Sequence, residues 1–127
     1  MTSPKKDPAI AIQIRRDFRD VGVCLPRLRK LVATVCKRFG GRQGFGVYEI
    51  SIAIVDDAAI KKLNARFLSR SATTDCLSFD LSDAKTPHAN ALNSRTLELI
   101  VNGEMAARQA ALRGHSGEAE LALYITH

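Results

Sequence analysis

The chain has 127 residues and a mass of 13.9 kDa, enough for one domain with a single hydrophobic core and too short for two. Hydrophobic residues make up 46% and charged residues 25%, which argues against a disordered or low-complexity protein. No apolar run approaches the roughly 18 residues of a membrane span, and residues 1–8 lack the apolar core of a signal peptide. We therefore expect one domain over residues 1–127, cytoplasmic and without a membrane partner.

The charge of +6 is unevenly distributed along the chain. Residues 1–42 contain eleven basic and three acidic side chains, a net charge of +8, whereas the remainder carries −2. A basic half suggests a polyanionic partner, because Lys and Arg neutralise phosphates and release their counterions. The alternative is a solvated helix face that aids solubility. Cys24, Cys36 and Cys76 form an odd set without C-x-x-C spacing, which is typical of reduced, packed thiols.

The first predicted elements are a strand and a basic helix. Alternating Ile10, Ile12 and Ile14 indicate a short strand with one apolar face. Pro26 then occupies the first turn of a helix that Gly40 and Gly41 are expected to end. Its apolar stripe is Leu28, Leu31, Val32, Val35, Cys36 and Phe39. Outside the stripe are Arg27, Arg29, Lys30, Lys37 and Arg38, so this helix carries much of the basic surface.

Residues 47–55 predict a strand that is covered mainly on one side, because large apolar residues alternate with smaller ones. Asp56 and Asp57 follow it, and Ile60, Leu63 and Phe67 continue at helical spacing. Two adjacent carboxylates after a strand could hold Mg²⁺ in a nuclease site. The simpler interpretation is that they cap the next helix and complement its dipole.

The next segments complete the predicted sheet. Residues 74–81 and 97–101 alternate as strands, the polar residues 82–96 form a loop between them, and residues 103–112 form a helix that Gly114 ends. The order of elements predicts an α+β fold in which helices pack against a four-stranded mixed sheet.

The last helix is expected to begin at Ser116, its N-cap, and to run through the apolar residues 121–125. Glu118 and Glu120 suit its first turn, where negative charge complements the helix dipole. His127 follows with no Gly, Asn or Pro to stop the helix. This pattern predicts an incomplete last helix in a chain that has been cut short.

Four groups of residues carry a family resemblance. They are Ile54-Val55-Asp56-Asp57 with Ile60 and Leu63-Asn64; Thr74-Asp75-Cys76-Leu77-Ser78-Phe79; Arg108-Gln109-Ala110 with Gly114-His115-Ser116; and Glu120-Leu121 with Thr126-His127. In this order they resemble the YbeY family, the bacterial endoribonucleases of ribosomal RNA maturation. The resemblance covers residues 50–127, with looser agreement before them.

The resemblance implies a metal-hydrolase fold and a zinc-dependent, single-strand-specific endoribonuclease that acts in 3′-end maturation of ribosomal RNA and in ribosome quality control. Ribosomal RNA and the small ribosomal subunit are the implied partners, without DNA specificity. The family binds one zinc ion through H-x₃-H-x₅-H, in which helical i, i+4 spacing aligns two imidazoles and leaves a position for water. Only the first of these histidines, His127, is present, so we expect an incomplete site and an inactive chain.

Two further departures concern histidines and an arginine. His88 and His115 lack i+4 spacing to His127, and a local hydrogen bond at the helix start is expected for His115. Many family members carry an arginine toward the RNA phosphate where this chain has Leu68. Arg66 and Arg70 flank that position and are candidate RNA contacts, together with Arg27, Arg29 and Lys30.

Two other functions remain open at this point. A basic, non-catalytic domain that binds ribosomal RNA or the ribosome would keep the surface without the chemistry. A metallopeptidase-like hydrolase is less favoured, because no H-E-x-x-H motif occurs in the chain. The catalytic residues stay unassigned.

Overall fold

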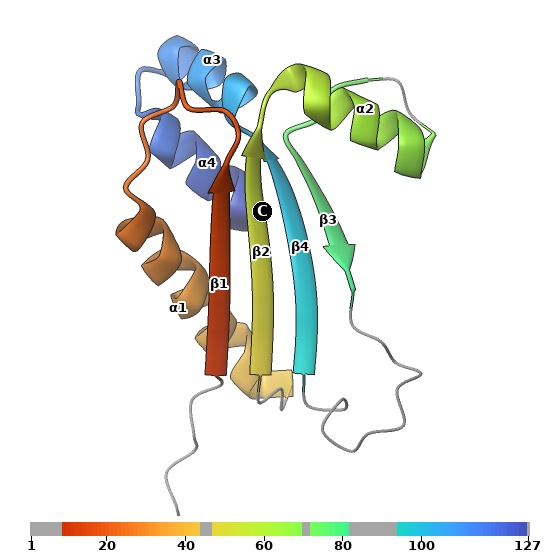
Figure 1. The fold of residues 1–127 in the computed structure, drawn as a ribbon. Coiled ribbons are helices and arrows are strands. Elements are labelled where there is room, and N and C mark those ends of the chain that lie inside the picture. Colours follow the sequence, from red (N-terminus) through yellow and green to blue (C-terminus); the bar gives the residue numbers. More distant parts are fainter. Residues whose placement is uncertain (1–8, 44–46, 70–71, 82–93, 127) are drawn as a thin grey trace, which may run out of the picture.

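A computed structural model describes residues 9–43, 47–69, 72–81 and 94–126 (Figure 1). Its elements in chain order are β1 (Ala9–Arg16), α1 (Leu25–Gln43), β2 (Val47–Val55), α2 (Asp57–Leu68), β3 (Cys76–Asp80), β4 (Ser94–Asn102), α3 (Gly103–Arg113) and α4 (Gly117–Thr126). No helix in these ranges is long and apolar enough to cross a lipid bilayer.

The four strands form one mixed sheet in the order β1-β2-β4-β3. β1, β2 and β4 are parallel, whereas β3 runs antiparallel to β4 and lies at the edge of the sheet (Figure 1). The α+β fold with a four-stranded mixed sheet is therefore confirmed. In a parallel pair the carboxyl ends of the strands meet at the same end of the sheet, and here Val55 of β2 pairs with Asn102 of β4.

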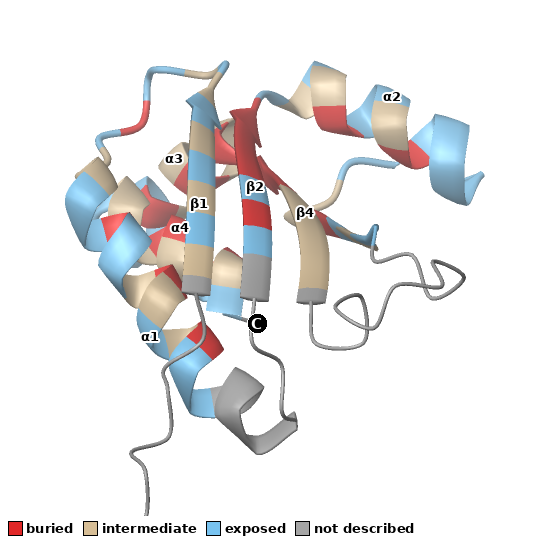
Figure 2. Ribbon diagram, turned by 60° about the horizontal axis from the view of Figure 1, so that its bottom comes forward, coloured by how far each residue is buried: buried red, intermediate tan, exposed pale blue. Residues whose placement is uncertain are grey.

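One face of the sheet is covered by α1 and α4. Ile50, Ile52 and Ile54 of β2 are buried there with Leu28 of α1 and Leu121 of α4, as part of the larger hydrophobic core. Figure 2 shows buried segments on β2, α1 and α4. Because successive side chains of a strand point to opposite faces, the alternation predicted for residues 47–55 accounts for this core.

Among the described residues, the opposite face is covered by α2, near the carboxyl ends of the parallel strands. Ile60 of α2 packs there on Ala53, Val55, Leu77 and Ile100, which form a second, smaller core. Farther along the same face, Gln13 of β1 and Ser51 of β2 are exposed. The prediction of a sheet covered mainly on one side is confirmed.

Several predicted boundaries and contacts were wrong. α1 continues to Gln43 through Gly40 and Gly41, because glycine weakens a helix by about 1 kcal/mol but keeps its backbone hydrogen bonds. β4 begins at Ser94, inside the predicted loop 82–96, of which residues 82–93 lie outside the described ranges. Phe67 does not join the apolar face of α2 but is 55% exposed.

Other local predictions are confirmed. The helix α3 ends at Gly114, which has a φ of 73°, in the left-handed region that glycine adopts at little cost. Ser116 caps α4, since its Oγ accepts a hydrogen bond from the backbone N–H of Ala119 at 3.1 Å. Cys24, Cys36 and Cys76 are free thiols.

Candidate functional site

The carboxyl ends of β2 and β4 hold the segment that leads into β3. The fully buried side chain of Asn102 donates from Nδ2 to Asp57 Oδ1 at 2.7 Å, to Thr73 Oγ1 at 3.2 Å and to the Thr74 carbonyl at 3.1 Å. The backbone N–H of Asn102 donates to the carbonyl of Asp75 at 2.8 Å. One residue at the end of β4 therefore positions residues 73–75 beside the sheet.

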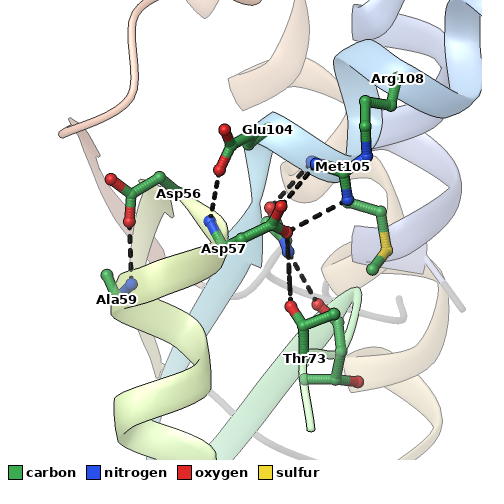
Figure 3. Close-up of polar contacts among 9 residues, drawn as sticks. Asp56, Asp57, Ala59, Thr73, Glu104, Met105 and Arg108 are labelled. Carbon is green, nitrogen blue, oxygen red and sulfur yellow. Dashed lines mark hydrogen bonds and ion pairs between the residues drawn. The ribbon is translucent and has the colours of Figure 1, made fainter.

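Asp57 joins the start of α2 to α3. Its backbone N–H donates to Glu104 Oε1 at 2.9 Å, and both of its carboxylate oxygens contact the guanidinium of Arg108 (Figure 3). The hydrogen bond from Arg108 lowers the pKa of Asp57, and that from Asn102 adds to the effect, while burial opposes them. Asp57 is therefore an anion at neutral pH, in a fixed ion pair.

The capping interpretation of the two adjacent aspartates is confirmed for Asp56. Its Oδ1 accepts a hydrogen bond from the backbone N–H of Ala59 at 2.8 Å, as Figure 3 shows. The Asp57 side chain points to Arg108 and not to a shared position with Asp56. Each carboxylate is thus engaged with a different protein partner, which does not match the shared magnesium ligation considered above.

A buried carboxylate links α3 to α4. Glu120 is fully buried, and its Oε1 accepts a hydrogen bond from Arg113 at 3.0 Å and lies 2.6 Å from His115 Nε2. Burial alone would raise the pKa of Glu120, but hydrogen bonds from His115 and Tyr124 and the charge of Arg113 bring it below its ordinary value. The first-turn position predicted for Glu120 and the local hydrogen bond predicted for His115 are both confirmed.

A hollow of about 380 Å³ lies between the last turns of α4 and the start of β3. It is lined by Asp75, Arg113, Leu123, Tyr124 and Thr126. Burial and the hydrogen bond to the Glu120 carboxylate raise the pKa of Tyr124 to about 12, so its hydroxyl keeps its proton at neutral pH and donates it to Glu120. The hollow combines a carboxylate, a guanidinium and a phenol, which suits a polar, partly anionic ligand.

The described residues do not by themselves form a zinc site. Among them, no three His, Cys, Asp or Glu side chains gather in a way that could hold a metal ion. His127, the predicted ligand, lies outside the described residues, directly after Thr126 of the hollow, and His88 lies outside them as well. His115 contacts Glu120, and burial with the charge of Asp75 raises the pKa of the Cys76 thiol to about 11. The thiol is thus protonated at neutral pH in the metal-free chain.

The candidate RNA contacts lie on two sides of the sheet. Arg29 and Lys30 are exposed on α1, and Arg27 Nε of the same helix donates to Glu118 Oε1 of α4 at 3.0 Å. Arg66 is exposed on α2, which covers the opposite face (Figures 1 and 2). The structure therefore separates Arg66 from the basic residues of α1. Arg70 lies outside the described residues, and Leu68 is 49% exposed at the end of α2.

Asn102, Arg108 and Tyr124 had no role predicted from the sequence. Asn102 had a usable signal, because an asparagine directly after an apolar strand and before a helix is a preferred N-cap, and its Oδ1 accepts from the N–H of Met105 at 2.9 Å. Arg108 had none, since its partner Asp57 lies about fifty residues away in the chain, whereas the partner of Tyr124 is Glu120, four residues before it on the same helix.

Comparison with known proteins gives consistent matches. A family model described as Endoribonuclease YbeY matches residues 13–127. The Endoribonuclease YbeY of Gloeobacter violaceus is 38% identical over 86 residues, which cover 67% of this chain and 44% of the relative. That of Porphyromonas gingivalis is 35% identical over 102 residues, which cover 70% of this chain and 65% of the relative. The chain thus spans about half to two thirds of the length of these curated relatives.

A solved structure shares the fold. The solution structure of TM1509 from Thermotoga maritima superimposes with a TM-score of 0.55 and 20% sequence identity, over 91% of this chain and 67% of the other. At this identity the likeness concerns the arrangement of strands and helices, which agrees with the mixed sheet described above.

Proposed function

The chain belongs to the YbeY family of endoribonucleases, and on this basis we propose that it acts in the endonucleolytic cleavage of single-stranded RNA during 3′-end maturation of ribosomal RNA and in ribosome quality control. The family match over residues 13–127 carries the proposal. The proposed partners are ribosomal RNA and the small ribosomal subunit, in the cytoplasm.

The hollow at the end of α4 is the proposed position of the scissile phosphate. Arg113 supplies positive charge at its wall, whereas the proton of the Tyr124 hydroxyl is already donated to Glu120. Asp75 is held at the entrance of β3 through the backbone N–H of Asn102. Arg113 would attract the phosphate, whereas the Asp75 carboxylate would repel it, and the catalytic group that attacks the phosphate stays unassigned.

Zinc is the proposed cofactor of the family reaction, and His127 is its proposed ligand in this chain. A bound zinc ion supplies a water molecule whose pKa is lowered toward about 7. A catalytic zinc site takes three protein ligands, and the described residues supply no such group. We therefore expect the chain alone to retain less than one equivalent of zinc and to cleave RNA poorly.

The test compares this chain with one extended by the remaining histidines of H-x₃-H-x₅-H. The extended chain should bind zinc and cleave single-stranded RNA, and His127→Ala in it should lower both sharply, because each of three imidazoles is needed for tight binding. Zinc is measured after exhaustive dialysis and cleavage on matched single-stranded and duplex RNA. Full zinc affinity after His127→Ala, or equal cleavage by the shorter chain, would contradict the proposal.

A second candidate function is a domain that binds ribosomal RNA without cleaving it. It is favoured by the +8 charge of residues 1–42, together with the lack of a three-ligand group among the described residues. The same experiment separates the two functions. RNA binding by the extended, zinc-loaded chain without any cleavage would support the binding domain.

A further inference from the structure

A second pocket lies on the other side of the edge strand β3, between the last turns of α2, the end of β3 and residues 98–100 within β4. Its volume is about 300 Å³, within the lower range of small-molecule sites, and its apolar lining includes Leu63, Phe67, Phe79 and Ile100. Phe67 is 55% exposed and so is Leu81 at its rim. Exposed large apolar side chains around a concave surface are the usual mark of a binding site.

The aromatic rings in this pocket are arranged as a pair with a cation. The Phe67 and Phe79 centroids are 5.6 Å apart at an interplanar angle of 68°, an edge-to-face contact. The guanidinium carbon of Arg66 lies 5.3 Å from the Phe67 centroid, within the range of a cation–π interaction. The contact holds an exposed positive charge directly beside an exposed aromatic ring.

We propose that this pocket receives an unpaired base of the RNA, with Phe67 and Phe79 contacting the base and Arg66 contacting the adjoining phosphate. The inference rests on the proposed function and adds a binding position to it. Proteins recognise single-stranded RNA by placing unstacked bases against aromatic rings, while cations nearby follow the backbone. Glu98 also lines the pocket, and its negative charge disfavours a phosphate inside it. The base therefore occupies the interior and the phosphate stays at the rim.

The position of the pocket agrees with a continuous RNA path. β3 is the edge strand, and its residues alternate between the two sides of the sheet: Cys76 packs against the core beneath α4, whereas Leu77 and Phe79 belong to the core beneath α2. The hollow at the end of α4 contains Asp75, the residue just before this strand. A single-stranded RNA that passes over the β3 edge of the sheet can thus reach both the hollow and the base pocket.

The test measures the affinity of the chain for a single-stranded RNA oligonucleotide, for the same oligonucleotide with abasic positions, and for duplex RNA. Phe67→Leu keeps an apolar side chain but removes the ring, and should weaken single-strand binding about tenfold. Phe67→Tyr keeps the ring and should retain affinity. Leu112→Ala, which alters a side chain 79% exposed on α3, is the matched control and should change nothing.

The salt dependence of RNA affinity distinguishes the contact with the base from the contact with the phosphate. Phe67→Leu should leave the slope of log affinity against log salt unchanged, whereas Arg66→Gln should reduce that slope by about one phosphate contact. Circular dichroism of each variant confirms that it is folded. Unchanged affinity of Phe67→Leu, or equal binding of the abasic oligonucleotide, would overturn the base pocket alone. No affinity of the unaltered chain for single-stranded RNA would overturn the proposed function as well.

Discussion

At the scale of single residues, polar side chains buried at the ends of strands organise the site. Asn102 is fully buried, yet its amide and its backbone N–H contact five residues before and after β4. A buried polar group costs little free energy only when its hydrogen bonds are made. The free energy of unfolding should therefore depend strongly on this one side chain.

We predict that Asn102→Ala lowers the free energy of unfolding by about 2 kcal/mol, because Asp57 and the Thr74 carbonyl lose a donor. Thr73→Ala removes only one of the contacts of Asn102 at an exposed position and should cost less than about 1 kcal/mol. Denaturation in urea measures both. Equal losses in the two variants would contradict the central role of Asn102.

The Asp57 carboxylate makes stability depend on pH. Its pKa is lower in the folded chain than its ordinary value, so the unfolded chain binds the proton more readily. The stabilisation is present above the ordinary aspartate pKa, about 3.9, and is lost as pH falls through the lower folded value. Melting temperature should fall below about pH 4, and less steeply in Asp57→Asn. If Asp57→Asn shows the same pH dependence, the loss of stability at low pH comes from other acidic residues, of which Glu120 is the first candidate.

At the scale of elements, the close approach of α3 and α4 to the sheet depends on glycine. A Cβ on Gly103 would lie 2.6 Å from Ile54 Cγ2, and one on Gly117 would lie 2.4 Å from Val21 Cγ2. At the first residue of both helices, side chains of the larger core leave no room for a Cβ atom. The first turns of α3 and α4 are thus seated against residues 21 and 54, which positions the hollow at the end of α4.

We predict that Gly103→Ala lowers the free energy of unfolding by about 1–3 kcal/mol through overpacking, in spite of the higher helix propensity of alanine. Gly22→Ala is the matched control, because a Cβ there meets nothing within 4 Å, and it should be neutral or slightly stabilising. Melting temperatures at one protein concentration provide the comparison. A neutral Gly103→Ala would mean that Ile54 moves aside without loss of packing.

At the scale of the whole molecule, the sheet divides the candidate RNA surface. Arg29 and Lys30 lie on α1 over one face, and Arg66 lies with the base pocket over the other. Exposed basic side chains bind phosphates without sequence preference and with strong salt dependence. The basic residues of α1 should therefore contribute salt-dependent binding to phosphates, whereas the surface around Arg66 should also contribute contacts with a base.

We predict that Arg27→Gln combined with Arg29→Glu and Lys30→Glu weakens RNA binding at low salt and flattens its salt dependence. Arg27 is neutralised and not reversed, because a carboxylate there would face Glu118. At high salt the variant and the unaltered chain should converge, since screening removes the difference. An unchanged slope would assign the basic excess of residues 1–42 to solubility.

Local patterns in the sequence were sufficient for most of the fold. The alternation of residues 47–55, the cap at Ser116 and the stop at Gly114 each depend on residues within one element, and the structure has all three. The period of apolar residues specifies which face of a strand or helix is buried, because side chains repeat every two or 3.6 residues. The mixed four-stranded sheet follows from the order of these elements.

The candidate sites depend on contacts between segments distant in the chain. β3 precedes β4 in sequence but lies at the edge of the sheet, and this order brings Asp75 to the end of α4 and Phe79 to Phe67. Glu120 lies in the first turn of α4 as predicted, but its burial against Arg113 and His115 was not predicted. Periodicity identifies an apolar face but not the partner that covers it. The hollow, the buried carboxylate and the base pocket therefore required the packed molecule.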